Sequence, residues 1–365
     1  MNKLLKLIAV SLLFATTSST YAVDGFEGTW VKPDEATIPA NALGDQIRYG
    51  RELVTNSYKT LGGGSNFMPP YTGNKLSCSN CHMENGTAAY AGPWSIVALK
   101  YADPGIYSAR EQLYRNRQLR INGCMERSMD GVALPETGPE MLAILSYFDW
   151  LATGMKVTSH TLVKGTGFLN VPDLTRAADP VKGKEIYKEK CAPCHQEDGN
   201  GVWDPDAEKY IYPAVFGGNS FNDGAGMYRL RTGVTFIYSN MPYGRADAST
   251  AAVLKDVSSL LSQADAWDVT AYIMSQPRPV FYNQLNDWGL LLGPDKVPNY
   301  LKKVADADYP NLYPRANYAV NICAPPDLNS PPLFDQTLHK YGPWTSITSV
   351  LNKWIANYKA SCIVP

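Results

Sequence analysis

The chain has 365 residues, of which 45% are hydrophobic and 18% are charged, so it can bury the cores of two ordinary domains. Its formal net charge is −1, which excludes the strongly basic surface typical of nucleic-acid-binding proteins. No nucleic-acid partner is therefore expected. Seven cysteines and only four histidines limit the metal sites that the chain can build.

The first 22 residues have the features of a secretory signal peptide. Lys3 and Lys6 form a short basic start, residues 7–15 are apolar, and Thr20-Tyr21-Ala22 is typical of a cleavage site. The apolar stretch is too short to span a bilayer, which argues against a retained anchor. We expect cleavage near Ala22 and export to the periplasm. No later segment is apolar for long enough to be a membrane span.

Two C-x-x-C-H motifs organise the rest of the chain. They are Cys78, Cys81 and His82, and Cys191, Cys194 and His195. In each motif the cysteines can form thioethers to the vinyl groups of a haem, and the histidine can coordinate its iron. Zinc sites built from these motifs would be short of ligands, because the only other histidines are His160 and His339. Two covalently bound haem c groups are therefore predicted, haem 1 and haem 2 in chain order.

Each haem motif lies in a module of helix, motif, loop and terminal helix. Helical spacing of apolar residues covers 47–58 before the first motif. Before the second motif, Asp179 can cap a helix and Pro180 suits its first position. Aromatic-rich terminal helices are predicted at 139–153 and from about 263 to 275. The arrangement resembles that of small class I cytochromes c, which implies a mostly α fold with two class I cytochrome c-like domains in tandem.

The chain then divides into four parts. We predict a signal peptide at 1–22, a first cytochrome c-like domain with a catalytic haem at 23–165, a second with an electron-transfer haem at 166–280, and a C-terminal extension at 281–365. The extension is rich in proline and tyrosine, and we interpret it as a segment wrapped over the two domains. It contains Cys323 and Cys362, for which a disulfide is plausible in an oxidising compartment.

The second iron needs a ligand from the loop before the terminal helix. Met241 lies in an Asn-Met-Pro-Tyr-Gly turn, 50 residues after Cys191, and a Met-Pro turn in this position is the usual source of a thioether ligand. We predict Met241 as that ligand, with Met227 or Lys255 as the alternative.

In the first module the corresponding position, 46 residues after Cys78, is occupied by Cys124. Met125 and Met129 flank it and remain alternative ligands. A thiolate lowers the haem potential and a methionine raises it, so Cys124 would make haem 1 the low-potential centre. Five arginines lie nearby in sequence: Arg110, Arg115, Arg117, Arg120 and Arg127. Some can serve haem propionates or solvent, but guanidinium groups also bind oxyanions, which suggests an anionic sulfur substrate.

The segment 121–131, which contains Cys124, resembles the dihaem thiosulfate dehydrogenases, which also act as tetrathionate reductases. The resemblance extends over roughly 40–280 and includes 221–227 and 240–244. It implies a periplasmic oxidoreductase that interconverts two thiosulfate ions and tetrathionate, with two electrons passing through haem 1 and haem 2.

The resemblance also implies roles for single residues. Cys124 would ligate the iron of haem 1, and Arg110, Arg120 and Ser128 would line the thiosulfate pocket. Some family members ligate haem 2 through a lysine before the methionine. Asn240 stands at that position here, which favours ligation by Met241.

Other functions remain as alternatives. A non-enzymatic dihaem electron-transfer cytochrome c would leave Cys124 and its arginines unexplained. A sulfur-oxidising cytochrome that conjugates thiosulfate to a carrier protein would need a protein acceptor, and a dihaem peroxidase would need an open iron position. For the enzyme we expect an external cytochrome c or a quinol-linked protein to exchange electrons at haem 2.

Overall fold

The computed structural model describes residues 31–102, 105–108, 113–153, 155, 165–169, 171–244 and 261–282. The predicted signal peptide, nearly all of the extension with its two cysteines, and three residues considered above (Arg110, His160 and Lys255) lie outside this part of the chain. Within it, no helix is long and apolar enough to cross a membrane.

The first module is built around the crossing of its first long helix and its terminal helix. Its elements are η1 (Glu35–Thr37), α1 (Ala42–Thr55), α2 (Ser57–Leu61), η2 (Cys78–Asn80), α3 (Met83–Gly86), α4 (Ser95–Lys100), β1 (Ile106–Ser108), β2 (Leu113–Arg115), α5 (Arg117–Arg127) and α6 (Pro139–Leu151). Asn41 starts α1 by accepting hydrogen bonds from the backbone N–H groups of Leu43 and Gly44. A Cβ at Gly50 would lie 1.9 Å from the Ala143 carbonyl oxygen, so this glycine lets α1 and α6 cross closely.

The second module repeats this plan. Its elements are α7 (Pro180–Lys190), α8 (Ala192–His195), β3 (Val202–Asp204), β4 (Lys209–Tyr212), η3 (Gly226–Tyr228), α9 (Leu230–Asn240) and α11 (Gln263–Ser275). The Asp179 carboxylate accepts from the N–H groups of Val181 and Lys182, and Pro180 occupies the first turn, as predicted. At the crossing of α7 and α11, a Cβ on Gly183 would lie 1.9 Å from the Asp268 carbonyl oxygen.

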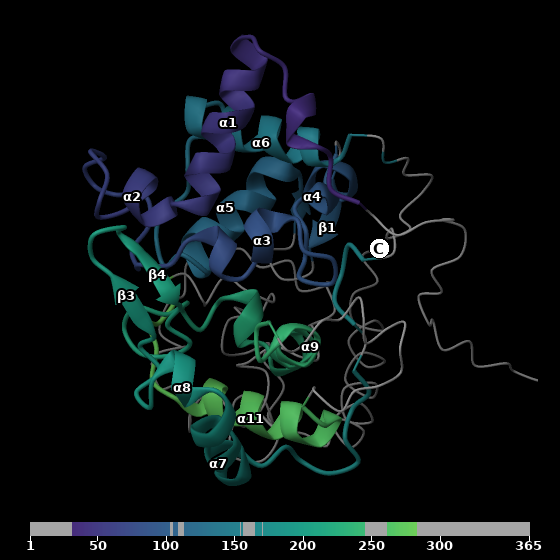
Figure 1. Cartoon of the computed structure of the whole chain (residues 1–365), viewed down its shortest axis with the longest axis vertical. Helices are drawn as coiled ribbons and strands as arrows, with labels where there is room; N and C mark the ends of the chain where they lie inside the picture. The colour runs from purple at the N-terminus through teal and green to yellow at the C-terminus, as the bar shows by residue number, and fades with distance from the viewer. Residues whose placement is uncertain are drawn as a thin grey trace, which may run out of the picture.

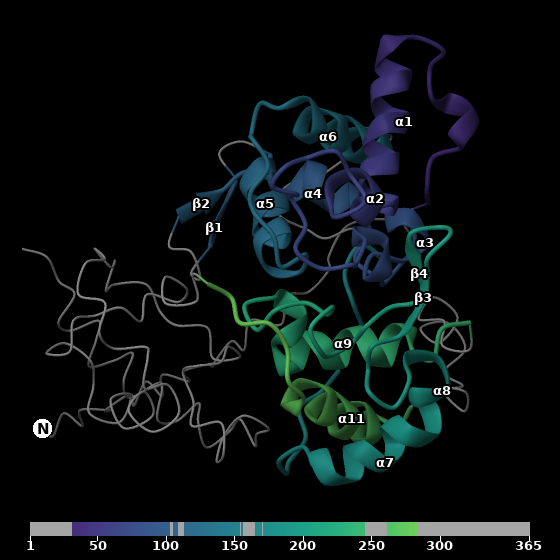
Figure 2. The same cartoon turned by 90° about the vertical axis from the view of Figure 1, so that its left-hand side faces the viewer.

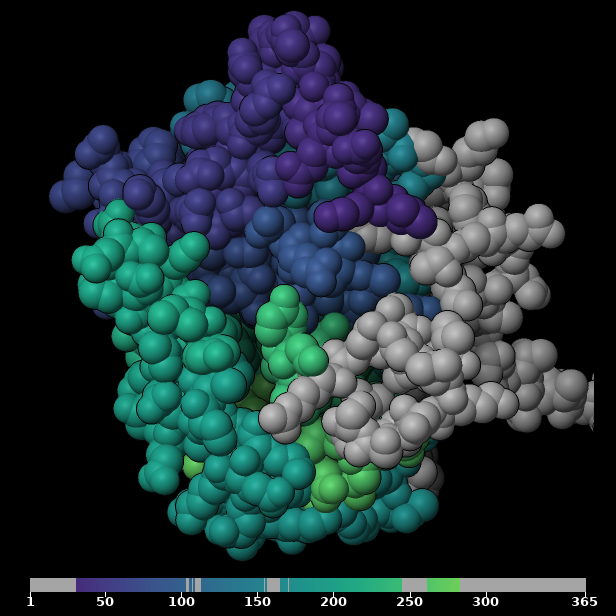
Figure 3. Space-filling model, in the orientation of Figure 1, coloured from purple at the N-terminus to yellow at the C-terminus, as the bar shows by residue number. Residues whose placement is uncertain are grey.

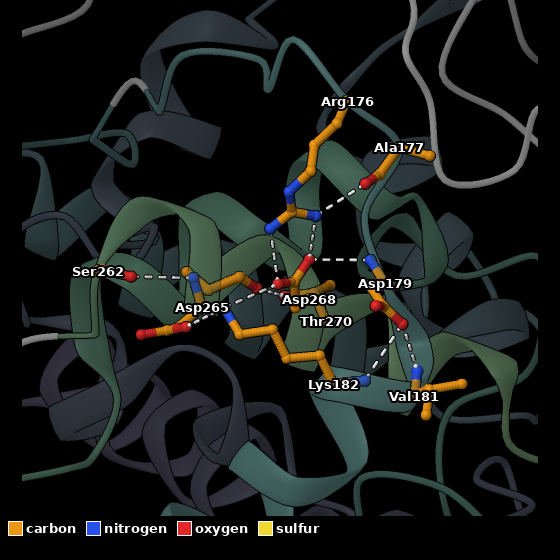
Figure 4. A network of polar contacts seen from close by, with 10 residues as sticks. Arg176, Ala177, Asp179, Val181, Lys182, Ser262, Asp265, Asp268 and Thr270 are labelled. Atoms are coloured by element: carbon orange, nitrogen blue, oxygen red, sulfur yellow. Dashed lines mark hydrogen bonds and ion pairs between the residues drawn. The ribbon is translucent and has the colours of Figure 1, made fainter.

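A buried carboxylate fastens the start of α7 to α11 (Figure 4). The Asp268 side chain is fully buried and accepts two hydrogen bonds from the Arg176 guanidinium, at 2.7 and 2.8 Å. It also accepts from the Asp179 N–H at 2.8 Å and lies 3.4 Å from Lys182 Nζ. These contacts favour the ionised form and lower the pKa of Asp268, although burial alone would raise it.

The two modules lie one above the other, with α9 on the face of the second module that is turned toward the first (Figures 1 and 2). The space-filling view shows the two bodies in contact along this face (Figure 3). The β3–β4 hairpin reaches the first module, where the Trp203 ring packs edge-on against Tyr58 at 5.0 Å and Lys75 lies 4.8 Å from its centroid. Asn240 at the end of α9 donates to the Tyr90 carbonyl at 3.2 Å.

The mostly α fold predicted from the sequence is confirmed, and the terminal helices end within two residues of their expected limits. The two antiparallel hairpins, β1–β2 and β3–β4, were not predicted from the sequence; their strands are only three or four residues long. The predicted domain boundary at 165/166 stays a prediction, because 156–164 lie outside the described residues.

Candidate functional site

Both C-x-x-C-H motifs adopt a helical turn. In the first, the His82 N–H donates to the Cys78 carbonyl at 3.0 Å, and in the second the His195 N–H donates to the Cys191 carbonyl at 2.8 Å. Each histidine therefore lies one turn beyond the first cysteine of its motif, on the same side of the backbone.

The two histidines are oriented in the same way. His82 Nδ1 lies 2.5 Å from the Gly92 carbonyl oxygen, and His195 Nδ1 lies 2.8 Å from that of Pro213. Because a carbonyl only accepts, Nδ1 carries the proton and Nε2 keeps its lone pair for a metal. Burial lowers the pKa of His82 to about 4 and also lowers that of His195, so both imidazoles are neutral, as ligands must be.

The motif cysteines suit thioether formation better than metal binding. None of the five described cysteines is in a disulfide. Burial raises the pKa of the Cys78 thiol to about 11 and those of Cys81 and Cys191 to about 12, so these groups stay protonated at neutral pH. Within the described residues, no three His, Cys, Asp or Glu side chains are grouped to hold a metal ion by themselves. The residues of both motifs therefore fit haem c.

The third cysteine of the first module lies on the last turn of α5. Asn116 caps the start of this helix by accepting from the Leu119 N–H. Near its middle, the Asn122 side chain exchanges two hydrogen bonds of 2.9 Å with the Leu134 backbone. At its end, the Ser128 N–H donates to the Cys124 carbonyl. These contacts hold Cys124 on a rigid element.

Arg120, one turn before Cys124, places its guanidinium on the thiol. Arg120 Nη1 lies 2.6 Å from Cys124 Sγ, and charge on this sulfur raises the pKa of Arg120 above its usual value. The same sulfur contributes to the raised pKa values of Cys78 and Cys81, after burial. Cys124 is therefore close enough to the first haem motif to interact with it electrostatically. Met125 and Met129 are instead buried in the apolar core.

Tyr101 is a further candidate site residue, which the sequence did not predict. Its ring centroid lies 5.7 Å from the Arg115 guanidinium carbon and 5.9 Å from that of Arg120. Burial favours the neutral phenol, but the positive charges of Arg120, Arg115 and Lys100 outweigh it, so the pKa of Tyr101 is lowered. Tyr101 lies 23 residues before Cys124 with no motif around it, so only the fold could reveal it.

The structure separates the predicted arginines by role. Arg117 pairs with Asp149 on α6. Arg127 is buried, 3.8 Å from a Glu126 carboxylate oxygen. Arg120 contacts the Cys124 sulfur, and Arg115 lies over the Tyr101 ring. Of the four predicted catalytic residues, Cys124, Arg120 and Ser128 occupy α5 and its C-cap, whereas Arg110 lies outside the described residues.

In the second module, Met241 directly follows α9, and its N–H donates to the Ile237 carbonyl at 2.9 Å. Its side chain and that of Met227, on η3, are both partly buried against the core. The choice of Met241 as iron ligand therefore stays a prediction.

Two helical modules, each with an oriented histidine one turn after a cysteine, define a c-type cytochrome. The cytochrome c family model matches residues 180–277. A thiosulfate dehydrogenase from Psychrobacter arcticus is 36% identical over 280 residues, which cover 77% of this chain and 77% of the relative. One from Allochromatium vinosum is 34% identical over 286 residues, which cover 77% of this chain and 96% of the relative. The chain belongs to the thiosulfate dehydrogenase family, and the resemblance seen in the sequence is confirmed.

A solved structure agrees. It is a thiosulfate dehydrogenase (TsdBA) from Marichromatium purpuratum, with a TM-score of 0.61, 28% identity and 84% of this chain covered. The match covers 56% of the solved chain, so this chain spans little more than half of that protein. The cytochrome c fold and the use of haem c are thereby confirmed.

Proposed function

We propose that the protein interconverts two thiosulfate ions and one tetrathionate ion in the periplasm, with two covalently bound haem c groups carrying the two electrons. The observation that carries this proposal is the pair formed by Cys124 and Arg120, with 2.6 Å between sulfur and guanidinium nitrogen, beside the first haem motif. A pure electron carrier has no use for such a pair. The names of the relatives support the same substrate.

Each residue then has a role. Cys78 and Cys81 would attach haem 1 and His82 would bind its iron, while Cys191, Cys194 and His195 would do the same for haem 2. Cys124 and Met241 would each supply a second protein ligand, to haem 1 and haem 2 respectively. When bound, each haem accepts or returns one electron, which matches a two-electron reaction.

The main electrostatic obstacle is that two dianions must meet. One pair of unit charges at ~4 Å costs roughly 4 kcal/mol at an effective dielectric of ~20, and two dianions cost about four times as much. The Arg120 guanidinium offsets part of this repulsion, and Arg110 would offset more. Ser128 would donate a hydrogen bond to a sulfonate oxygen.

Holding the first thiosulfate covalently lowers the cost further. The Cys124 thiolate and the outer sulfur of thiosulfate form an S–S bond, giving Cys–S–S–SO3⁻ and releasing two electrons, which the two haems would accept. The outer sulfur of a second thiosulfate then attacks the sulfur that carries the sulfonate group, the bond from that sulfur to Cys124 Sγ breaks, tetrathionate leaves, and the Cys124 thiolate is regenerated. Charge and atoms balance in both steps, and the reverse sequence reduces tetrathionate.

Electrons must leave through a second protein. His/thiolate ligation would lower the potential of haem 1 and His/Met ligation would raise that of haem 2, so haem 2 would be the exit toward an external cytochrome c or a quinol-linked partner.

The test supplies purified holoprotein with thiosulfate and an artificial one-electron acceptor. Two acceptor molecules should be reduced for each tetrathionate formed, and the intact mass should correspond to two haems. The electron carrier would be favoured by two results together. The haems would be reduced without formation of tetrathionate, and tetrathionate would not be consumed when it is supplied with a reductant for the reverse reaction.

A further inference from the structure

The turn that follows Cys124, residues 126–130, is held from the other module. Asn222, which is 0% exposed, donates its backbone N–H to the Arg127 carbonyl at 3.2 Å. Its side-chain Nδ2 donates to the Glu126 carbonyl at 3.0 Å and to Asp130 Oδ1 at 2.8 Å. One side chain of the second haem module thus binds both ends of a five-residue turn in the first.

Asn74 makes a matching set of contacts from within the first module. Its Nδ2 donates to the Ser128 carbonyl at 2.9 Å and to the Ser220 carbonyl at 3.1 Å, so it ties the turn to the segment that carries Asn222. The N–H groups of Gly73 and Asn74 both donate to the Met129 carbonyl, at 2.9 and 3.2 Å. Asn74 is 2% exposed, so these bonds are shielded from water.

The first two residues of the extension, Phe281 and Tyr282, lie against the same turn. The Phe281 ring lies 4.4 Å from the guanidinium carbon of Arg127, and the Tyr282 hydroxyl donates to Glu126 Oε1 at 3.1 Å. The Phe281 N–H donates to Asp223 Oδ1 at 2.7 Å, which fixes this segment beside Asn222.

These contacts leave the Cys124 backbone little freedom. The turn after it is bound by Asn222 and Asn74, and the helix before it is bound through Asn122 and Leu134. The inference rests on the proposed function, in which Cys124 both ligates the haem 1 iron and bonds to thiosulfate. Its sulfur must therefore move between iron and substrate. We infer that Asn222 is a positioning residue of the active site, which holds the turn after Cys124 from the second module so that the sulfur moves by side-chain rotation alone.

The variant Asn222→Asp tests this inference. Asn222 Oδ1 accepts from the Gly224 N–H at 3.1 Å, and aspartate keeps that local bond. It removes the two Nδ2 donations and places a second carboxylate beside Asp130. Asn200→Asp is the matched control, because Asn200 is exposed and its Nδ2 likewise donates to a carboxylate, that of Asp198, at 2.9 Å. Trp203→Leu disturbs the module interface at Tyr58 instead.

Two measurements are made on holoproteins, neither of which requires turnover. Magnetic resonance of the ferric protein gives the ratio of thiolate-bound to thiolate-free haem 1, and amide hydrogen exchange reports on residues 126–130. In Asn222→Asp we expect that ratio to fall roughly tenfold, because the variant loses one or two buried hydrogen bonds. We also expect amide hydrogen exchange to accelerate in the turn. Both controls should match the wild type, and the haem 2 signal should stay unchanged in all.

The inference would be overturned if Asn222→Asp kept the wild-type ratio of thiolate-bound to thiolate-free haem 1 and the wild-type exchange rates. It would also be overturned if this ratio fell equally in Trp203→Leu. If Asn222→Asp does not assemble, Asn222→Ala removes the same donors without added charge and is read in the same way. A wild-type protein without any thiolate signal would refute the ligand assignment in the proposed function. The exchange comparison then still decides whether Asn222 holds the turn.

Discussion

Replacing Arg120 by glutamine removes the guanidinium that lies 2.6 Å from the Cys124 sulfur. A unit charge at ~4 Å from one charge of thiosulfate is worth roughly 4 kcal/mol at an effective dielectric of ~20. Arg120 is partly exposed, so solvent reduces this value, and the loss of a single oxyanion donor typically costs about 3 to 4 kcal/mol. We therefore expect kcat/KM for thiosulfate to fall by about 10² to 10³.

The assay is the initial rate of tetrathionate formation over a range of thiosulfate concentrations. Arg120→Lys keeps the charge but loses the planar fork, and we expect an intermediate loss of about tenfold. Arg117→Gln is the control on the same helix; because Arg117 pairs with Asp149, its kcat/KM should change by less than about twofold. An Arg120→Gln variant that carries both haems and stays within about threefold of the wild type would refute the reasoning.

Three further predictions concern Tyr101, Asp268 and Gly183. Tyr101→Phe removes the hydroxyl that bonds to Arg115 and Arg120. We expect KM for thiosulfate to rise about fivefold, with less change in kcat. Unchanged steady-state kinetics would contradict this prediction. Asp268→Asn should lower the free energy of unfolding by about 2 kcal/mol at neutral pH. The pKa of Asp268 is lower in the folded than in the unfolded protein. Its contribution to the free energy of unfolding is therefore complete above the unfolded pKa, about 4, and is lost as the pH falls through the folded pKa. Denaturant unfolding should therefore give a difference between wild type and variant that shrinks in acid, and a constant difference would contradict the assignment. Gly183→Ala forces a Cβ against the Asp268 carbonyl and should lower the unfolding temperature. Gly218→Ala is the control, because a Cβ at Gly218 would have no atom within 4 Å, and it should leave the unfolding temperature unchanged. Equal shifts in the two variants would contradict the close crossing of α7 and α11.

Local signals allowed much of the fold to be predicted. The haem motifs are contiguous, Asp179 and Pro180 mark the start of α7, and aromatic residues at helical spacing mark the terminal helices. The two short hairpins were missed, because strands of three or four residues are too short to show an alternating pattern.

The candidate site also contains residues that the sequence could predict and residues that it could not. Arg120 and Cys124 are one helical turn apart, so their contact follows from sequence spacing once α5 is recognised. Tyr101 and Asn222 reach the site only through folding, from 23 residues before Cys124 and 98 residues after it. Their contacts depend on how the two modules pack and on a loop path that no local pattern encodes.

The central claim is that the sulfur of Cys124 performs the chemistry. Its most direct test compares tetrathionate formation by the wild type, Cys124→Gly and, as a control for the neighbouring sulfur, Met129→Leu, each shown to carry both haems. We predict activity in the wild type and in Met129→Leu, and a fall in the rate by a factor of at least about 10³ in Cys124→Gly, as expected for removal of a nucleophile. Tetrathionate formation by Cys124→Gly at a rate near that of the wild type would contradict it.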